Sequence, residues 1–187
     1  ASEDGHSDLF WALRGGGGNF GLVTSFEFRL HSVGPNLLAG PIVWDATDAG
    51  EVLRFYRDFI REAPDELGTV VRFGTAPPLP DIPKDLHWRP VMMVGSCYSG
   101  PIKDGEQVLR ALRAFRTPLL DLVGPTPYVG FQSALDSTVM HGWNYYWKST
   151  HLPELRDDLI DVIAEHAFSC LSPRSYVAMF HLKGAVS

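Results

Sequence analysis

The feature that most constrains the fold of this chain is a run of four glycines at residues 15–18. The run stands between a short apolar segment that starts at Asp8 and an alternating segment, in the sequence DLFWALRGGGGNFGLVTSFEFRL. Asp8 is a plausible N-cap, so the first segment predicts a short helix. Apolar residues recur with period two between Phe20 and Leu30, which predicts a strand. Glycines between these elements can adopt φ > 0 and let a ligand reach main-chain N–H groups.

Two common nucleotide-binding motifs are excluded by the surroundings of this loop. Gly16, Gly18 and Gly21 have the spacing G-x-G-x-x-G, but a dinucleotide fingerprint needs a strand before the glycines and a helix after them. The predicted order here is the reverse. A P-loop is excluded because Leu22 and Val23 occupy the positions of its Lys and Ser/Thr. From spacing alone, a tight helix-to-strand turn that binds nothing remains the alternative.

Residues 8–21 resemble a segment of a known family nearly residue for residue. The pattern D-L-F-W-A-x-R-G-G-G-G followed by N-F-G resembles the end of the flavin-binding domain in FAD-linked oxidases of the vanillyl-alcohol-oxidase (PCMH-type FAD-binding) superfamily, in the berberine-bridge-enzyme-like group. The resemblance implies FAD as the cofactor of the full-length protein. It also implies FAD contacts at Gly15, Gly16, Gly17, Gly18, Asn19, Phe20, Gly21 and Val23.

Composition predicts a globular chain and argues against several partners. With 45% hydrophobic and 12% aromatic residues, the chain has ample material for a packed core. Its formal charge of −6, without a basic run, argues against nucleic acid and anionic membranes. No apolar run approaches the roughly 20 residues of a membrane span, so we expect a soluble protein, with a cytoplasmic location favoured. The spacing of two cysteines and seven histidines predicts neither a disulfide framework nor a metal site.

Beyond residue 35 the hydrophobic pattern alternates between strands and helices. We expect strands at 38–44, 69–75, 90–98, 143–150 and 176–182, helices at 48–63, 104–115 and 153–168, and a short helix at 128–135. A turn is expected at 124–127. This order favours an α+β fold, with a mostly antiparallel sheet and helices on one face. Together with the resemblance, it predicts that residues 1–34 form the C-terminal helix-loop-strand of an FAD-binding domain. Residues 35–187 would then be a substrate domain that is incomplete at its C-terminus.

The open face of such a sheet supplies a second candidate site. On the strand expected at 143–150, Asn144, Tyr146 and Lys148 point away from the neighbouring aromatics. With His181 on the last strand, these polar and aromatic groups suit a substrate held above a flat ring. The substrate-face candidates are therefore Tyr146, Lys148 and His181. A polar solvent face without a ligand is the alternative interpretation.

The family resemblance extends to both of these strands and implies the reaction. The sequence YYWKS at 145–149 resembles a family strand ending in K-S, and residues 181–186 resemble an H-x-G-G-A segment in which Lys183 replaces the first glycine. The implied activity is an FAD-dependent oxidase that transfers hydride from an organic alcohol or amine-type substrate to flavin, with oxygen as acceptor. No catalytic base is assigned, and the chain looks like an internal fragment that is inactive alone. The alternative is a non-catalytic α+β ligand-binding or interaction domain without flavin; the oligomeric state is not predicted.

Overall fold

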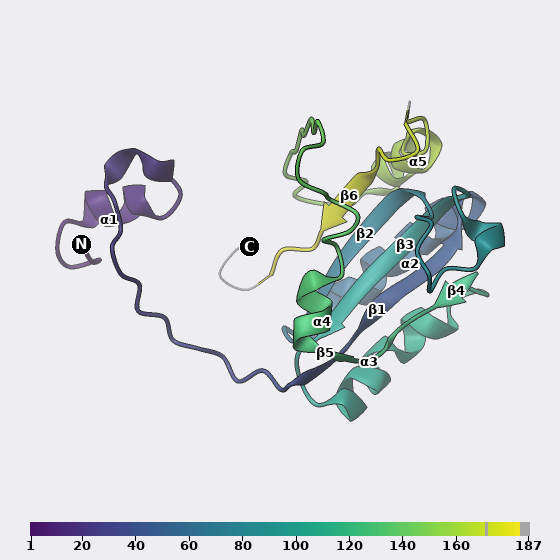
Figure 1. Cartoon of the computed structure of the whole chain (residues 1–187), viewed down its shortest axis with the longest axis horizontal. Helices are drawn as coiled ribbons and strands as arrows, with labels where there is room; N and C mark the ends of the chain where they lie inside the picture. The colour runs from purple at the N-terminus through teal and green to yellow at the C-terminus, as the bar shows by residue number, and fades with distance from the viewer. Residues whose placement is uncertain (171, 184–187) are drawn as a thin grey trace. The chain divides into compact units, whose positions relative to one another are not determined.

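The computed structural model describes residues 1–170 and 172–183. The chain divides into two compact units, residues 1–32 and the residues from 33 onward, which are described here separately. The first unit contains helix α1 (Ser7–Leu13), followed by a single 3₁₀ turn, η1 (Gly17–Phe20). The predicted short helix before the glycine run is therefore present (Figure 1).

The strand expected between Phe20 and Leu30 is not formed, so this part of the predicted helix-loop-strand is wrong. No described strand pairs with this segment, and its large apolar side chains are exposed: Leu22 at 87%, Phe26 at 67% and Phe28 at 71%. Phe26 and Phe28 instead stack on each other, with ring centroids 5.3 Å apart. An alternating pattern specifies a strand only when a neighbouring strand satisfies its backbone and a core receives its apolar face. The described residues supply neither.

The second unit is built on one antiparallel sheet, which confirms the predicted α+β class (Figure 1). The spatial order is β4-β1-β3-β2-β6, with β5 also paired to β1, and every pairing is antiparallel. The strands are β1 (Asn36–Asp45), β2 (Leu67–Thr75), β3 (Pro90–Tyr98), β4 (Leu120–Asp121), β5 (Gly124–Pro127) and β6 (Val177–Phe180). The three long central strands were all predicted from sequence.

The longer helices pack on one face of this sheet, as predicted. The helices of the unit are α2 (Ala49–Arg61), α3 (Ile102–Ala114), α4 (Tyr128–Ser133) and α5 (Asp157–His166), with short 3₁₀ turns η2 (Ala46–Asp48) and η3 (Lys84–Leu86). The apolar stripes of α2, α3 and α5 meet Trp44, Phe73 and Met92 of the three central strands in the main core. Helix α2 lies behind the sheet in Figure 1. Among the described residues, no helix has both the length and the apolar character needed to cross a membrane.

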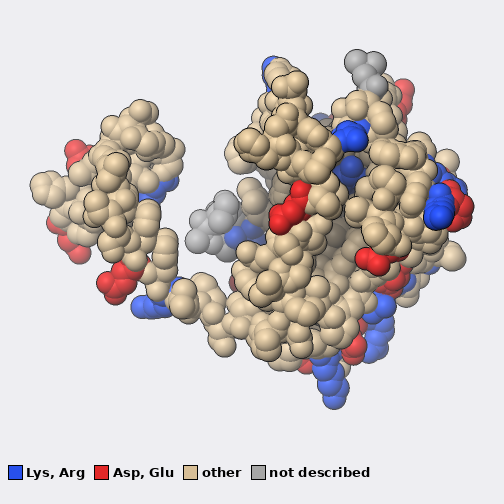
Figure 2. Space-filling model, viewed as in Figure 1, with Lys and Arg blue, Asp and Glu red and all other residues tan. Residues whose placement is uncertain are grey.

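The opposite face of the sheet is only partly covered. At one end, Val43 and Val91 pack under the proline-rich connector between β2 and β3, through Ala76, Ile82 and Leu86. Further along the same face the register places Arg72 of β2 beside Met93 of β3, and both side chains stay partly accessible. In the view of Figure 2, Lys and Arg side chains of this unit are visible along its right and lower edges and also in its upper part. This partly open face is where the sequence predicted a substrate.

Two further predicted elements differ in the structure. No strand forms at 143–150, where the segment has no ladder partner among the described residues. The turn expected at 124–127 is instead strand β5, which pairs with β1 in the register Leu38↔Pro125. Its prolines are tolerated because this short strand lies at the edge of the sheet, where a missing N–H breaks few ladder bonds. The last helix is present but shorter than the expected 153–168.

Candidate functional site

Three glycines of the loop after α1 have backbone angles that other residues rarely adopt. Gly15, Gly17 and Gly21 have φ values of 145°, 73° and 149°. An added Cβ at any of these positions would meet nothing within 4 Å, so the requirement for glycine comes from backbone conformation and not from crowding. The main chain on this side of the loop is thus open to close approach.

Neither Gly16 nor Gly18 has a positive φ, and the two differ in how crowded their surroundings are. A Cβ at Gly16 would lie 2.3 Å from the Phe20 ring and 2.5 Å from the carbonyl oxygen of Ala12, so glycine is needed there for packing. Gly18 has neither a positive φ nor any atom within 4 Å of an added Cβ. The loop's own conformation therefore explains every glycine except Gly18.

At Gly15, Gly17, Gly18 and Gly21 no atom lies within 4 Å of an added Cβ, so the main chain there could be approached by a flat or phosphate-bearing group such as a flavin. Phe20 and Val23 are half-exposed, at 48% and 51%, and could pack against such a group. The loop offers a surface and not an enclosing cavity, so it would form one wall of a flavin site. Assignment of the eight predicted residues, from Gly15 to Val23, to FAD contact remains a prediction.

The predicted substrate-face residues do not form a cluster in the described part of the chain. Tyr146 is 85% exposed, Lys148 is exposed and His181 is half-buried. No hydrogen bond or ion pair joins these three side chains to one another within residues 1–170 and 172–183. Burial lowers the pKa of His181, and the positive charge of Lys183 lowers it further. Their role at a substrate face remains a prediction.

Lys183 occupies the position where the resembled family has its first glycine, and the structure gives this lysine a partner. Its Nζ donates a hydrogen bond to the carbonyl oxygen of Ala63, just after α2, and lies 3.5 Å from Oδ1 of Asp65. The lysine thus ties the segment after β6 to the loop between α2 and β2. Residues 184–186 of the H-x-G-G-A segment lie outside the described residues.

The aromatic segment at 143–147 contacts the segment that leads into β6. The Arg174 guanidinium lies over the Trp143 ring, 4.0 Å from its centroid. The Trp147 ring meets the Tyr176 ring edge-on, with centroids 6.0 Å apart. The alternating pattern of this segment therefore does place its side chains in different surroundings, since Trp143 and Trp147 make these contacts and Tyr146 does not. What the segment lacks is a strand ladder.

Arg72 is a candidate site residue that the sequence analysis did not identify. Its guanidinium carbon lies 4.6 Å from the centroid of the Tyr176 ring, and its Nη1 donates to the carbonyl oxygen of Thr75 at 3.1 Å. The available signal was its position: Arg72 is the one charged residue in β2, between Val71 and Phe73, which both point into the core. Burial lowers the pKa of Arg72, with the Tyr176 hydroxyl acting in the opposite direction.

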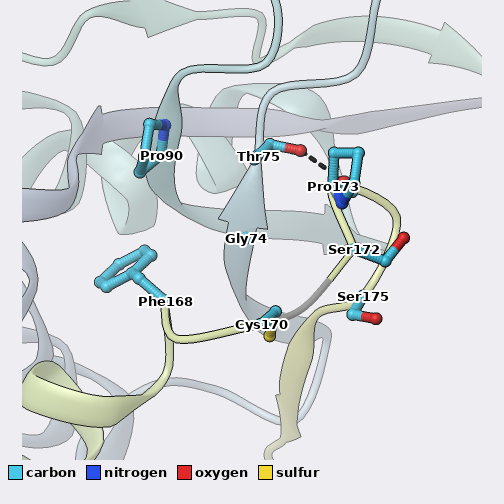
Figure 3. Close-up of a pocket in the computed structure, with 8 residues that line it drawn as sticks. All are labelled: Gly74, Thr75, Pro90, Phe168, Cys170, Ser172, Pro173 and Ser175. Carbon is cyan, nitrogen blue, oxygen red and sulfur yellow. Dashed lines mark hydrogen bonds between the residues drawn. The ribbon is translucent and has the colours of Figure 1, made fainter.

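A small pocket lies at the end of β2, next to this arginine (Figure 3). It is lined by Gly74, Thr75, Pro90, Phe168, Cys170, Ser172, Pro173 and Ser175. The Thr75 hydroxyl donates to the carbonyl oxygen of Pro173 at 2.6 Å, which joins β2 to the segment before β6. The described lining contains no charged side chain and no histidine, so it offers no base to activate a serine or cysteine. In the part of the chain that the structure describes, no group of His, Cys, Asp or Glu side chains is arranged to hold a metal ion.

Comparison with known proteins identifies relatives of this chain. No family model matches it. An FAD-linked oxidoreductase of Dictyostelium discoideum is 25% identical over 188 residues, which is 99% of this chain and 38% of the relative. The FAD-linked oxidoreductase pgmH of Aspergillus terreus is 63% identical over 35 residues, which is 19% of this chain and 7% of the relative. The chain therefore spans well under half the length of these curated relatives.

A solved structure has a similar fold. The 6-hydroxy-D-nicotine oxidase of Arthrobacter nicotinovorans matches with a TM-score of 0.57 and 26% sequence identity, over 77% of this chain and 30% of that one. A sequence likeness over almost the whole chain and a fold likeness over most of it thus lead to the same class of protein. Together they confirm the resemblance first seen in the glycine loop: this chain resembles part of an FAD-linked oxidoreductase.

Proposed function

We propose that the full-length protein is an FAD-dependent oxidase of an organic alcohol or amine-type small molecule. The observation that carries this proposal is the glycine loop, where an added Cβ at Gly15, Gly17, Gly18 or Gly21 would meet no atom within 4 Å, so that a ligand could approach the main chain. The similarity of 99% of the chain to an FAD-linked oxidoreductase supports the choice of FAD as that ligand. When bound, FAD would accept a hydride from a substrate carbon and pass the electrons to oxygen.

Each unit, taken by itself, offers its own kind of candidate contact. In the first, main-chain N–H groups from Gly15 to Gly21 would hold the cofactor, with packing by Phe20 and Val23. In the second, the partly open sheet face would bind the substrate, with Tyr146, Lys148 and His181 as candidate contacts. The lowered pKa of His181 favours its neutral imidazole, which can accept a proton. We assign no catalytic base among them.

Anaerobic substrate titration of the purified full-length protein tests this function. Candidate alcohols and amines are added without oxygen, and the visible absorbance of oxidised flavin is followed. We expect at least one of them to bleach this absorbance, and readmission of oxygen to restore it with formation of hydrogen peroxide. Restoration only by an artificial electron acceptor would contradict the assignment of oxygen as acceptor and would leave a dehydrogenase.

The second candidate is a ligand-binding domain that uses the sheet face without flavin. The observation that favours it is the absence of an enclosing cavity around the loop in the described residues. A full-length protein that is colourless after purification, and whose stability does not change when FAD is added, would support this alternative. Such a result would also overturn the oxidase.

A further inference from the structure

Arg72 differs from the other arginines in how its charge is compensated. Three further arginines are partly buried: Arg54, Arg57 and Arg113. Each of them pairs with a carboxylate at 2.7 Å or less, for example Arg113 with Oδ2 of Asp121 at 2.7 Å. Within the described residues, no carboxylate lies within 4.0 Å of the Arg72 guanidinium. Its charge is withdrawn from water without an anionic partner, which is unfavourable.

The surroundings of Arg72 hold its guanidinium in place without neutralising it. The Tyr176 ring covers one side at 4.6 Å, and the carbonyl oxygen of Thr75 accepts from Nη1 at 3.1 Å. Tyr176 is itself fixed by the edge of the Trp147 ring. Within the described residues Nη1 is the one nitrogen of this side chain that forms a hydrogen bond, so Nε and Nη2 keep donors for a ligand. A guanidinium ordered in this way loses little entropy when it binds an anion.

The position of Arg72 in the sheet determines what could reach it. Val71 and Phe73, its neighbours along β2, are both fully buried in the helix-covered core. Arg72 therefore projects from the opposite face, which is the face proposed to hold the substrate. The neighbouring rings of Tyr176 and Trp147 add apolar aromatic surface beside the charge. Such a combination suits an anion carried on an apolar or aromatic body.

We infer that Arg72 binds a carboxylate group of the substrate, and that the substrate is a small organic acid whose carboxylate this arginine anchors. This inference deepens the proposed function and depends on it for the identification of the ligand as a substrate. A planar carboxylate can accept two parallel hydrogen bonds from the guanidinium fork, which an amide or an ester cannot reproduce with the same charge. Arg72 would thus determine specificity without taking part in the redox step.

The test compares benzoate with benzamide as probes on the full-length protein, by titration calorimetry. The two probes have similar shapes, but only benzoate is an anion. We expect the wild type to bind benzoate at least about tenfold more tightly than benzamide, since a hydrogen-bonded charge pair discriminates by that factor or more. Arg72→Gln should abolish the difference, and Arg72→Lys, which keeps the charge but loses the fork, should restore only part of it. Arg110→Gln, at an exposed arginine of α3, is the matched control and should keep the full difference.

Several outcomes would overturn the inference. These are equal binding of the two probes by the wild type, an undiminished preference for benzoate in Arg72→Gln, and tighter binding of inorganic phosphate than of benzoate. Circular dichroism of each variant shows whether it is folded, and Arg72→Lys serves as the deciding variant if Arg72→Gln does not fold. Flavin content is measured on the same samples by absorbance. An Arg72-dependent preference for benzoate in a protein without flavin would support the anion site and contradict the oxidase.

Discussion

The Arg72 guanidinium lies over the ring of Tyr176, 4.6 Å from its centroid, and this contact connects strand β2 to the segment that enters β6. The Trp147 ring meets the Tyr176 ring edge-on, so three segments distant in sequence come together at one stack. When a cation lies over an aromatic face and is partly withdrawn from water, the contact stabilises it by about 1–2 kcal/mol. The stack therefore holds the proposed substrate-binding arginine in place on the partly open face of the sheet.

A double-mutant cycle at this stack should show energetic coupling between its two members. We expect Tyr176→Leu and Arg72→Met to interact by about 1 kcal/mol in the free energy of unfolding, because each substitution removes the same cation–aromatic contact. Urea unfolding of the two single variants, the double variant and the wild type measures the coupling. Strictly additive effects would mean that the contact contributes nothing to stability.

A second cycle concerns the buried hydroxyl pair between α2 and β2. The hydroxyl oxygens of Tyr56 and Thr69 are 2.7 Å apart, and both residues are buried. Tyr56→Phe and Thr69→Val should each destabilise the fold by about 1–2 kcal/mol, since each leaves one buried hydroxyl unsatisfied. The double variant should lose less than the sum, because it leaves no orphaned group. A loss equal to or greater than the sum, measured by urea unfolding, would contradict this account.

The same tyrosine should make stability depend on alkaline pH. Burial raises the pKa of Tyr56 above the value of 10.0 for a free tyrosine, and the hydrogen bond with Thr69 opposes this only in part. Above that value the unfolded chain releases the phenolic proton while the folded chain keeps it, so stability must fall as the pH rises. We expect the urea midpoint to decline between about pH 9 and pH 11, and Tyr56→Phe to decline less steeply over this range. Parallel declines would show that Tyr56 is not responsible.

Glycine is indispensable at one position of the central strand β1. Gly40 has a φ of 147°, and an added Cβ would lie 2.2 Å from the carbonyl oxygen of Leu122. Gly40→Ala should therefore cost at least about 3 kcal/mol or prevent folding, from backbone strain and steric overlap together. Gly68→Ala in β2 is the matched control, because its nearest contact would be an ordinary 3.8 Å and its φ is not positive. Thermal unfolding of the two variants should differ widely; equal melting temperatures would contradict the assigned backbone at Gly40.

The central fold was predictable because local patterns and tertiary packing agree there. The apolar stripe of α2 and the alternation in β1, β2 and β3 each match the face that the structure buries. The edge strand β5 was not predicted because its two prolines are typical of a turn. Only its pairing with β1 makes it a strand. The segments at 20–30 and 143–150 show the opposite error, because both were predicted as strands and neither forms one. Both alternate correctly, yet a strand also needs a neighbour, which local sequence does not specify.

The candidate site was predictable only in part, for a related reason. The glycine loop is continuous in sequence, so its unusual backbone could be expected from residue types alone. The arginine on the open face depends on contacts between β2 and a residue about a hundred positions away, Tyr176, and on the absence of a nearby carboxylate among the described residues. Neither property is visible in a linear pattern. Periodicity could show which face Arg72 occupies, but not that its charge lacks a partner.

The central claim is that the loop at residues 15–21 belongs to a flavin site, and flavin content tests it most directly. The ratio of flavin to polypeptide is measured by absorbance in the purified full-length protein and in its Gly18→Ala and Gly130→Ala variants. Gly130→Ala is the control, because there too the added Cβ would enter open space and the backbone has no positive φ. We predict a yellow wild type, a ratio several-fold lower for Gly18→Ala with unchanged stability, and no effect of Gly130→Ala. A colourless wild type that ignores added FAD, or a Gly18→Ala variant with full flavin content, would contradict the account.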